Sequence, residues 1–106
     1  MSTAIATVGE KLRQLREQNK LPLRKVAALL DIDVAILSKM ERGERKLTKD
    51  VVLKLANTYK YDKNELLVLF LSDKIVFELQ DEELGIDALK VAEEKIKYFR
   101  KSNGNY

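Results

Sequence analysis

A cluster of cationic side chains lies between residues 39 and 49, and it consists of Lys39, Arg42, Arg45, Lys46 and Lys49. Side chains of these types bind phosphate groups through charge-assisted hydrogen bonds. A basic segment is also an ordinary solvated surface, so residues 42–49 by themselves fit DNA contact and solvent exposure equally well. The elements around the cluster must decide between the two interpretations.

The sequence contains no set of residues typical of a catalytic site. The chain has no cysteine and no histidine, which excludes thiol nucleophiles, imidazole bases, disulfides and the usual zinc ligands. The acidic run Asp81-Glu82-Glu83 has no nucleophile, metal triad or phosphate-binding loop beside it, and we expect a solvated turn there. We therefore expect a protein that is not an enzyme and that uses no cofactor and no metal.

Length and charge indicate a small globular protein whose first part is basic. The 106 residues, 35% of them charged and 45% hydrophobic, suit one soluble domain with a short extension. Residues 1–71 hold 14 Lys and Arg against 9 Asp and Glu, whereas residues 72–106 hold 6 against 8. The apolar run 66–71 is too short to span a bilayer, and the N-terminus lacks a secretory pattern. We expect a cytoplasmic protein without membrane contact.

The first three helices follow from apolar spacing and capping residues. Apolar side chains in 8–18 recur at spacings of four and three, which predicts an amphipathic helix. Pro22 suits the first turn of a second helix that runs to about residue 30. Asp33 is placed to cap a third helix, and Gly43 is placed to end it. Two short helices therefore meet across a tight turn.

The remainder of the chain is also predicted to be helical. Thr48 and Asp62 are capping candidates for a fourth and a fifth helix. After a second turn, apolar residues recur at spacings of three, four and three, a pattern typical of a helix packed against one partner. These residues are Leu89, Ala92, Ile96 and Phe99.

The stretch VAALLDIDVAILSKMERG, preceded by LRQLRE and followed by LTKDVVLKLANTYKYDKNELL, resembles the Xre/Cro-type helix-turn-helix family of phage repressors and bacterial regulators. The resemblance covers residues 8–71. It implies a five-helix, phage-repressor-like DNA-binding domain at 8–71, and together with the helical pattern near the C-terminus it leads us to expect an all-α fold with a helical extension at 72–101. It also implies that Arg16 on the first helix pairs with Glu41 at the end of the third.

The same resemblance implies which side chains contact DNA. Base reading is carried over to the third helix, at Val34, Ala35, Ser38 and Lys39. Val34 and Ala35 are apolar where phage repressors commonly have polar residues, and such side chains can contact the methyl group of thymine. Leu23 stands where the family often has glutamine. Phosphate contacts are carried over to Arg24, Arg42, Arg45, Lys46 and Lys49.

The apolar content of the C-terminal third has two interpretations that the sequence leaves open. The extra helices either fold back on the same core or form a dimerisation surface, and we expect dimerisation because one such unit makes few DNA contacts. The candidate dimerisation residues are Phe70, Leu71, Ile75, Leu89, Ala92, Ile96 and Phe99.

We therefore expect a homodimeric transcriptional regulator that binds double-stranded DNA at a pseudo-palindromic operator. No ligand pocket is evident in the sequence, so we expect regulation by the protein's own concentration. Small members of the family include restriction–modification controller proteins and antitoxins, and the length favours an autoregulatory, controller-like protein. The alternative is an antitoxin-like or other interaction module whose residues 72–101 bind a partner protein.

Overall fold

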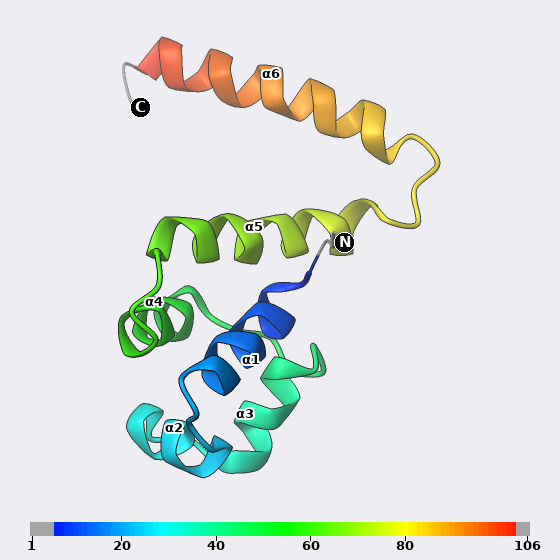
Figure 1. Cartoon of the computed structure of the whole chain (residues 1–106). Helices are drawn as coiled ribbons and strands as arrows, with labels where there is room; N and C mark the ends of the chain where they lie inside the picture. Colours follow the sequence, from blue (N-terminus) through cyan, green and yellow to red (C-terminus); the bar gives the residue numbers. More distant parts are fainter. Residues whose placement is uncertain (1–5, 104–106) are drawn as a thin grey trace. The chain divides into compact units, whose positions relative to one another are not determined.

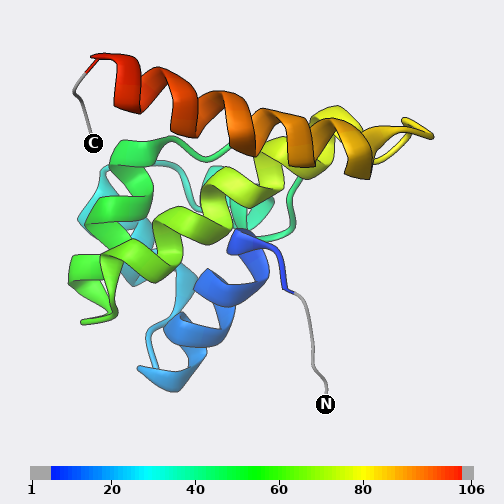
Figure 2. The ribbon, with the colours of Figure 1, turned by 90° about the horizontal axis from the view of Figure 1, so that it is seen from above.

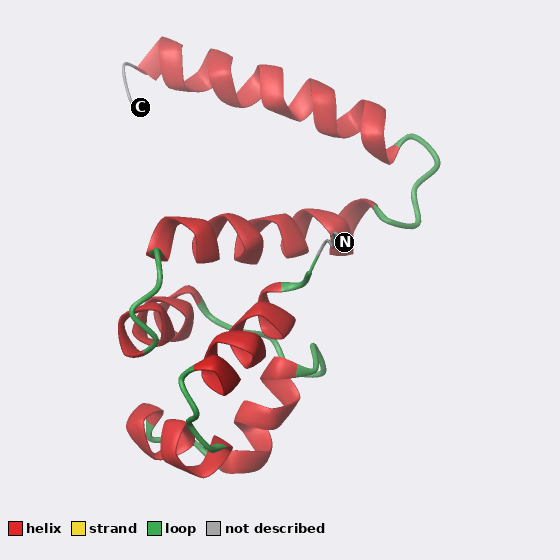
Figure 3. Cartoon of the chain, in the orientation of Figure 1, coloured by secondary structure: helices red, strands yellow, loops and turns green. Residues whose placement is uncertain are grey.

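The computed structural model describes residues 6–103, and these residues form α-helices and no strand (Figure 1; Figure 3). The predicted all-α fold is thereby confirmed. The helices are α1 (Val8–Gln18), α2 (Leu23–Leu30), α3 (Val34–Glu41), α4 (Lys49–Thr58), α5 (Lys63–Leu79) and α6 (Gly85–Asn103).

The described residues divide into two compact units between Lys74 and Ile75. The first unit holds α1 to α4 and most of α5, and the second holds the end of α5 and α6. The boundary predicted at residues 71/72 falls inside α5.

Helices α1 to α5 of the first unit enclose one hydrophobic core, and Figure 1 and Figure 2 show this unit from two directions. Each helix contributes the apolar stripe that its periodicity predicts. The buried core residues are Val8, Leu12, Leu15, Val26, Ala27, Leu37, Val52, Leu55, Ala56, Tyr59, Leu66 and Phe70.

Phe70 corrects one part of the predicted dimerisation surface. Its side chain is only 5% exposed, and the ammonium group of Lys74 lies 4.7 Å from the centre of its ring. The ring therefore stabilises the first unit and is not available to a partner. Leu71 and Ile75, which precede and follow the unit boundary, are exposed.

The helix ends show why these segments begin where they do. Asp33, Thr48 and Asp62 each accept a backbone N–H of the helix that follows, as expected of capping residues. Thr7 caps α1 in a capping box, which the sequence pattern T-V-G-E indicates in hindsight. Pro22 is the N-cap of α2 and not its first helical residue, because its backbone is extended.

Candidate nucleic-acid interface

Helices α2 and α3 are joined by a tight turn whose backbone groups are satisfied locally. The C-cap residue Asp31 adopts the left-handed conformation, and the N–H of Ile32 donates to the carbonyl oxygen of Ala27 over 3.0 Å. The carboxylate of Asp33 then accepts the N–H of Ala35 over 2.7 Å at the start of α3. Ala27 is buried, and its small side chain permits the close approach of α3. The turn therefore fixes the direction in which α3 leaves α2.

The end of α3 is attached to α1 by a buried ion pair. The Nε atom of Arg16 lies 2.8 Å from Oε2 of Glu41, and its Nη2 atom lies 3.1 Å from Oε1. The third nitrogen of Arg16 donates to the carbonyl oxygen of Leu21 over 2.9 Å. The two side chains that the family resemblance pairs thus meet in bidentate geometry, and α3 is held at both ends.

A close contact that the sequence does not predict reinforces this attachment. A Cβ atom at Gly9 of α1 would lie 2.7 Å from the carbonyl oxygens of Met40 and Glu41, so no larger residue fits there. The signal in the sequence is an isolated glycine inside a helical pattern, which often marks close packing. The carboxylate of Asp73 on α5 also accepts the N–H of Val8 over 2.9 Å at the N-terminus of α1.

One face of α3 remains open to solvent, and it carries the predicted base-reading residues. Val34, Ala35 and Lys39 are exposed, and Ser38 is half-buried. The opposite face is buried through Leu37, Met40 and Glu41. A helix that is packed against the protein on one face and exposed to solvent on the opposite face has the geometry needed to enter a DNA major groove.

The predicted phosphate contacts lie on α2, at the C-terminus of α3, on the loop that follows and at the start of α4. Arg24 is exposed on α2, and Arg42 is the C-cap residue of α3. Arg45 and Lys46 are exposed on the loop that leads to α4, drawn as a loop in Figure 3, and Lys49 is the first residue of α4. Arg42 therefore lies at the C-terminal end of the exposed helix, and Arg45 and Lys46 follow it on the loop.

Arg42 already has partners within the chain. Its Nε atom lies 3.0 Å from Oε2 of Glu44, its Nη2 atom lies 3.1 Å from Oε1, and its Nη1 atom donates to the hydroxyl of Ser38. The hydrogen bonds from Arg42 lower the pKa of the Glu44 carboxyl group, and the positive charge of Lys39 acts in the same direction. Glu44 was not among the predicted site residues, although it is an acidic residue within a basic stretch.

Tyr59, the C-cap residue of α4, is buried in the low-dielectric interior of the first unit, close enough to Arg16 and Glu41 to interact with their charges. Its hydroxyl group is buried and has no hydrogen-bond partner among the described residues. Burial raises the pKa of the phenol strongly, the negative charge of Glu41 raises it further, and the positive charge of Arg16 opposes this rise. The ion pair that holds α3 therefore lies in a region shielded from water.

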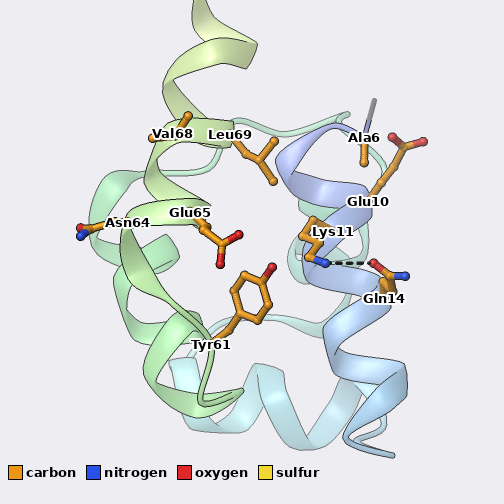
Figure 4. Close-up of a pocket in the computed structure, with 9 residues that line it drawn as sticks. All are labelled: Ala6, Glu10, Lys11, Gln14, Tyr61, Asn64, Glu65, Val68 and Leu69. Atoms are coloured by element: carbon orange, nitrogen blue, oxygen red, sulfur yellow. Dashed lines mark hydrogen bonds between the residues drawn. The ribbon is translucent and has the colours of Figure 1, made fainter. Parts of the chain in front are cut away.

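A surface groove lies elsewhere on the first unit, between α1 and the beginning of α5 (Figure 4). Its volume is about 960 Å³, and it includes none of the predicted DNA-contact residues. The ammonium group of Lys11 lies 4.9 Å from the ring centre of Tyr61 and donates to Gln14 over 3.4 Å. The groove is lined by Ala6, Glu10, Lys11, Gln14, Tyr61, Asn64, Glu65, Val68 and Leu69.

Residues 6–103 contain neither a metal-binding cluster nor a membrane-spanning helix. No group of three or more Asp or Glu residues in this range is arranged to hold a metal ion. Within the same range, no helix is both long enough and apolar enough to cross a membrane.

Comparison with known proteins identifies relatives of the first unit. A helix-turn-helix family model matches residues 12–66, which is just over half of the chain. A curated relative, the HTH-type transcriptional regulator DdrOP3 of Deinococcus deserti, is 36% identical over 58 residues, and these cover 55% of this chain and 45% of that protein. The match thus spans less than half of the relative's length. No solved structure matches the chain.

Proposed function

Because the chain belongs to the Xre/Cro-type helix-turn-helix family of DNA-binding transcriptional regulators, we propose that it binds a pseudo-palindromic operator as a homodimer. The observation that carries this proposal is the exposed face of α3 on a helix whose buried side is fixed by Arg16 and Glu41. A rigid reading helix loses little conformational entropy when it binds, so its contacts contribute fully to affinity.

The proposed readers differ in what they recognise. Lys39 donates to guanine, since its ammonium group is the exposed charge on the last turn of the helix. Val34 and Ala35 contact the methyl group of thymine, and Ser38 donates to a base or a phosphate. The surrounding cations position the protein on the sugar–phosphate backbone without reading sequence. They are Arg24, Arg42, Arg45, Lys46 and Lys49.

Dimerisation is supported by the apolar side chains that the second unit exposes. Ile75, Leu89, Ile96 and Phe99 are exposed, with Phe99 at 57%. Apolar side chains repeated along one side of a helix are favourable to bury against another chain. Ala92 of the second unit is a further candidate dimerisation residue, and so is Leu71, which is exposed on the first unit. A two-fold dimer reads two half-sites about one helical turn of DNA apart.

Autoregulation is the regulatory mode that we propose, in the manner of a controller protein. Occupation of its own promoter by such a dimer depends steeply on protein concentration, so no effector molecule is required. If the chain proves monomeric, the same exposed residues favour the alternative role, in which the second unit binds a partner protein as in an antitoxin.

Selection from a pool of random duplexes tests the proposed function. The purified protein is incubated with the pool, bound DNA is amplified and reselected, and the recovered duplexes are sequenced. We expect an inverted repeat whose half-sites are centred about 10 base pairs apart. Recovery of duplexes without a common sequence would contradict the proposal, because binding through basic charge alone selects no sequence.

A further inference from the structure

Glu44 has a fixed place next to the proposed reading helix because of the way α3 ends. Gly43 adopts the left-handed conformation with φ of 77°, and its N–H donates to the carbonyl oxygen of Met40 over 3.2 Å. The N–H of Glu44 donates to the carbonyl oxygen of Lys39 over 2.8 Å. This pair of hydrogen bonds is a Schellman motif, which turns the chain back toward the helix. The backbone therefore directs the Glu44 side chain to Arg42.

The contact between Glu44 and Arg42 occupies the part of the guanidinium group that recognises phosphate. Both carboxylate oxygens of Glu44 are engaged, at 3.0 and 3.1 Å, and Ser38 accepts from the remaining nitrogen. Carboxylates and phosphates bind the same planar fork of arginine in the same bidentate manner. A phosphate group that binds Arg42 through this edge must therefore displace Glu44.

The charge of Glu44 stays close to the DNA after such an exchange. It is the only acidic residue between Arg42 and Lys49, and Lys39 lies near enough to stabilise its negative charge. A carboxylate held among phosphate-binding cations repels every duplex to the same extent, whatever its sequence. Because this repulsion is the same for a cognate and a non-cognate duplex, it lowers both affinities by the same factor and leaves their ratio unchanged.

We propose that Glu44 is an affinity-limiting residue, which holds Arg42 in the absence of DNA and thereby weakens binding to every duplex. This inference rests on the proposed function, because it assumes that the exposed face of α3 meets DNA. Arg42 then contacts a phosphate only after Glu44 has been displaced, whereas the family resemblance implies a permanent phosphate contact.

The test compares Glu44→Gln with a matched control. Glu17→Gln removes the same charge from another exposed ion pair, in which Arg13 Nε lies 3.2 Å from Glu17 Oε2 on α1. Each protein is titrated by fluorescence anisotropy against a 30-base-pair duplex of scrambled sequence and against a duplex recovered by the selection above, over a series of salt concentrations. Thermal melts confirm that both variants remain folded.

We expect Glu44→Gln to bind the scrambled duplex about three- to tenfold more tightly than the wild type, with a salt slope steeper by about 0.9 per protomer. We expect the same gain on the selected duplex, so that the ratio of the two affinities is unchanged. Glu17→Gln should change neither affinity by more than about twofold. In an Arg42→Gln background, Glu44→Gln should lose most of its gain.

Three results would overturn the inference. One is the same affinity for the scrambled duplex in Glu44→Gln and Glu17→Gln. Another is a gain that persists in full without Arg42. The third is a loss on the selected duplex that exceeds any change on the scrambled one, because Glu44 would then orient Arg42 for base reading. If the wild type itself does not prefer the selected duplex, the proposed function fails; if it does and Glu44→Gln binds neither duplex more tightly than the wild type, only this inference fails.

Discussion

The guanidinium group of Arg16 on α1 donates hydrogen bonds to both carboxylate oxygens of Glu41, the last residue of α3, over 2.8 and 3.1 Å. The side chains of the two residues are only 11% and 5% exposed, so each charge depends on the other for compensation. This ion pair connects the scaffold of the first unit to the helix that carries the proposed base readers. Its first effect is on folding, and its effect on DNA binding follows from that.

Glu41→Ala should lower the free energy of unfolding by about 3–5 kcal/mol, because the buried guanidinium group of Arg16 loses the carboxylate that compensates it. Urea denaturation measures the change. Glu17→Ala, in the exposed pair with Arg13, is the control and should cost no more than about 1 kcal/mol. Wild-type stability combined with lost DNA binding in Glu41→Ala would show that Glu41 acts at the DNA surface and not as a support.

Lys39→Ala and Arg45→Ala should weaken DNA binding in different ways. Lys39→Ala should cost about 1–3 kcal/mol at one base position of the selected duplex, since a base contact is lost. Arg45→Ala should weaken all sequences alike and reduce the salt slope by about 1, since a phosphate contact is lost. Affinities for duplexes with single base changes distinguish the two. Equal loss on selected and scrambled DNA for Lys39→Ala would remove it from the base readers.

Tyr59→Phe should improve the tolerance of the fold to alkaline pH. Burial raises the pKa of Tyr59 above its ordinary value of 10.0, so its stabilising effect is complete below pH 10 and is lost as pH rises toward the pKa of the folded protein. Above pH 10 the wild type should lose stability more steeply than Tyr59→Phe, by up to about 1.4 kcal/mol per pH unit.

Urea denaturation between pH 8 and 11 measures this difference. Tyr98→Phe, at a phenol that is 66% exposed, is the matched control and should behave as the wild type does. Parallel stability curves for the wild type and Tyr59→Phe would mean that the Tyr59 phenol is not protected from ionisation.

Ile96→Gln should weaken dimerisation at least tenfold, because it removes an exposed apolar side chain from the centre of the α6 stripe. Sedimentation at micromolar concentration should show the wild type at twice the chain mass of 12.2 kDa. Lys97→Gln, at the neighbouring exposed position, should leave the dimer intact. A wild type that sediments only at 12.2 kDa would refute the homodimer and favour a partner protein for the second unit.

The sequence is most informative where the determinants are local. The stretch from Val26 to Gly43 contains the small residue, the cap and the terminal glycine that define two helices and their turn. Each acts within a few residues of its own position, so spacing alone is enough to predict it. The all-α fold followed from such patterns.

Features that depend on tertiary contacts were harder to predict from the sequence. Phe70 and Leu71 are adjacent apolar residues on α5, yet only Phe70 is buried, because helical periodicity identifies a stripe without saying what it faces. The closeness of Gly9 to the carbonyl oxygens of α3 depends on how two helices cross. The attachment of Glu44 to Arg42 depends on the conformation of Gly43 and on side-chain rotamers, which spacing does not encode.

Sequence-specific binding is the central claim, and fluorescence anisotropy tests it most directly. The wild-type protein is titrated against the duplex upstream of its own coding sequence and against a scrambled duplex of equal length, at two salt concentrations. We predict tight binding to the upstream duplex, with a dissociation constant of about 10⁻⁸ M or below, and weak, salt-sensitive binding to the scrambled one. Equally weak binding to both, lost together as salt rises, would contradict the account and leave only a basic surface.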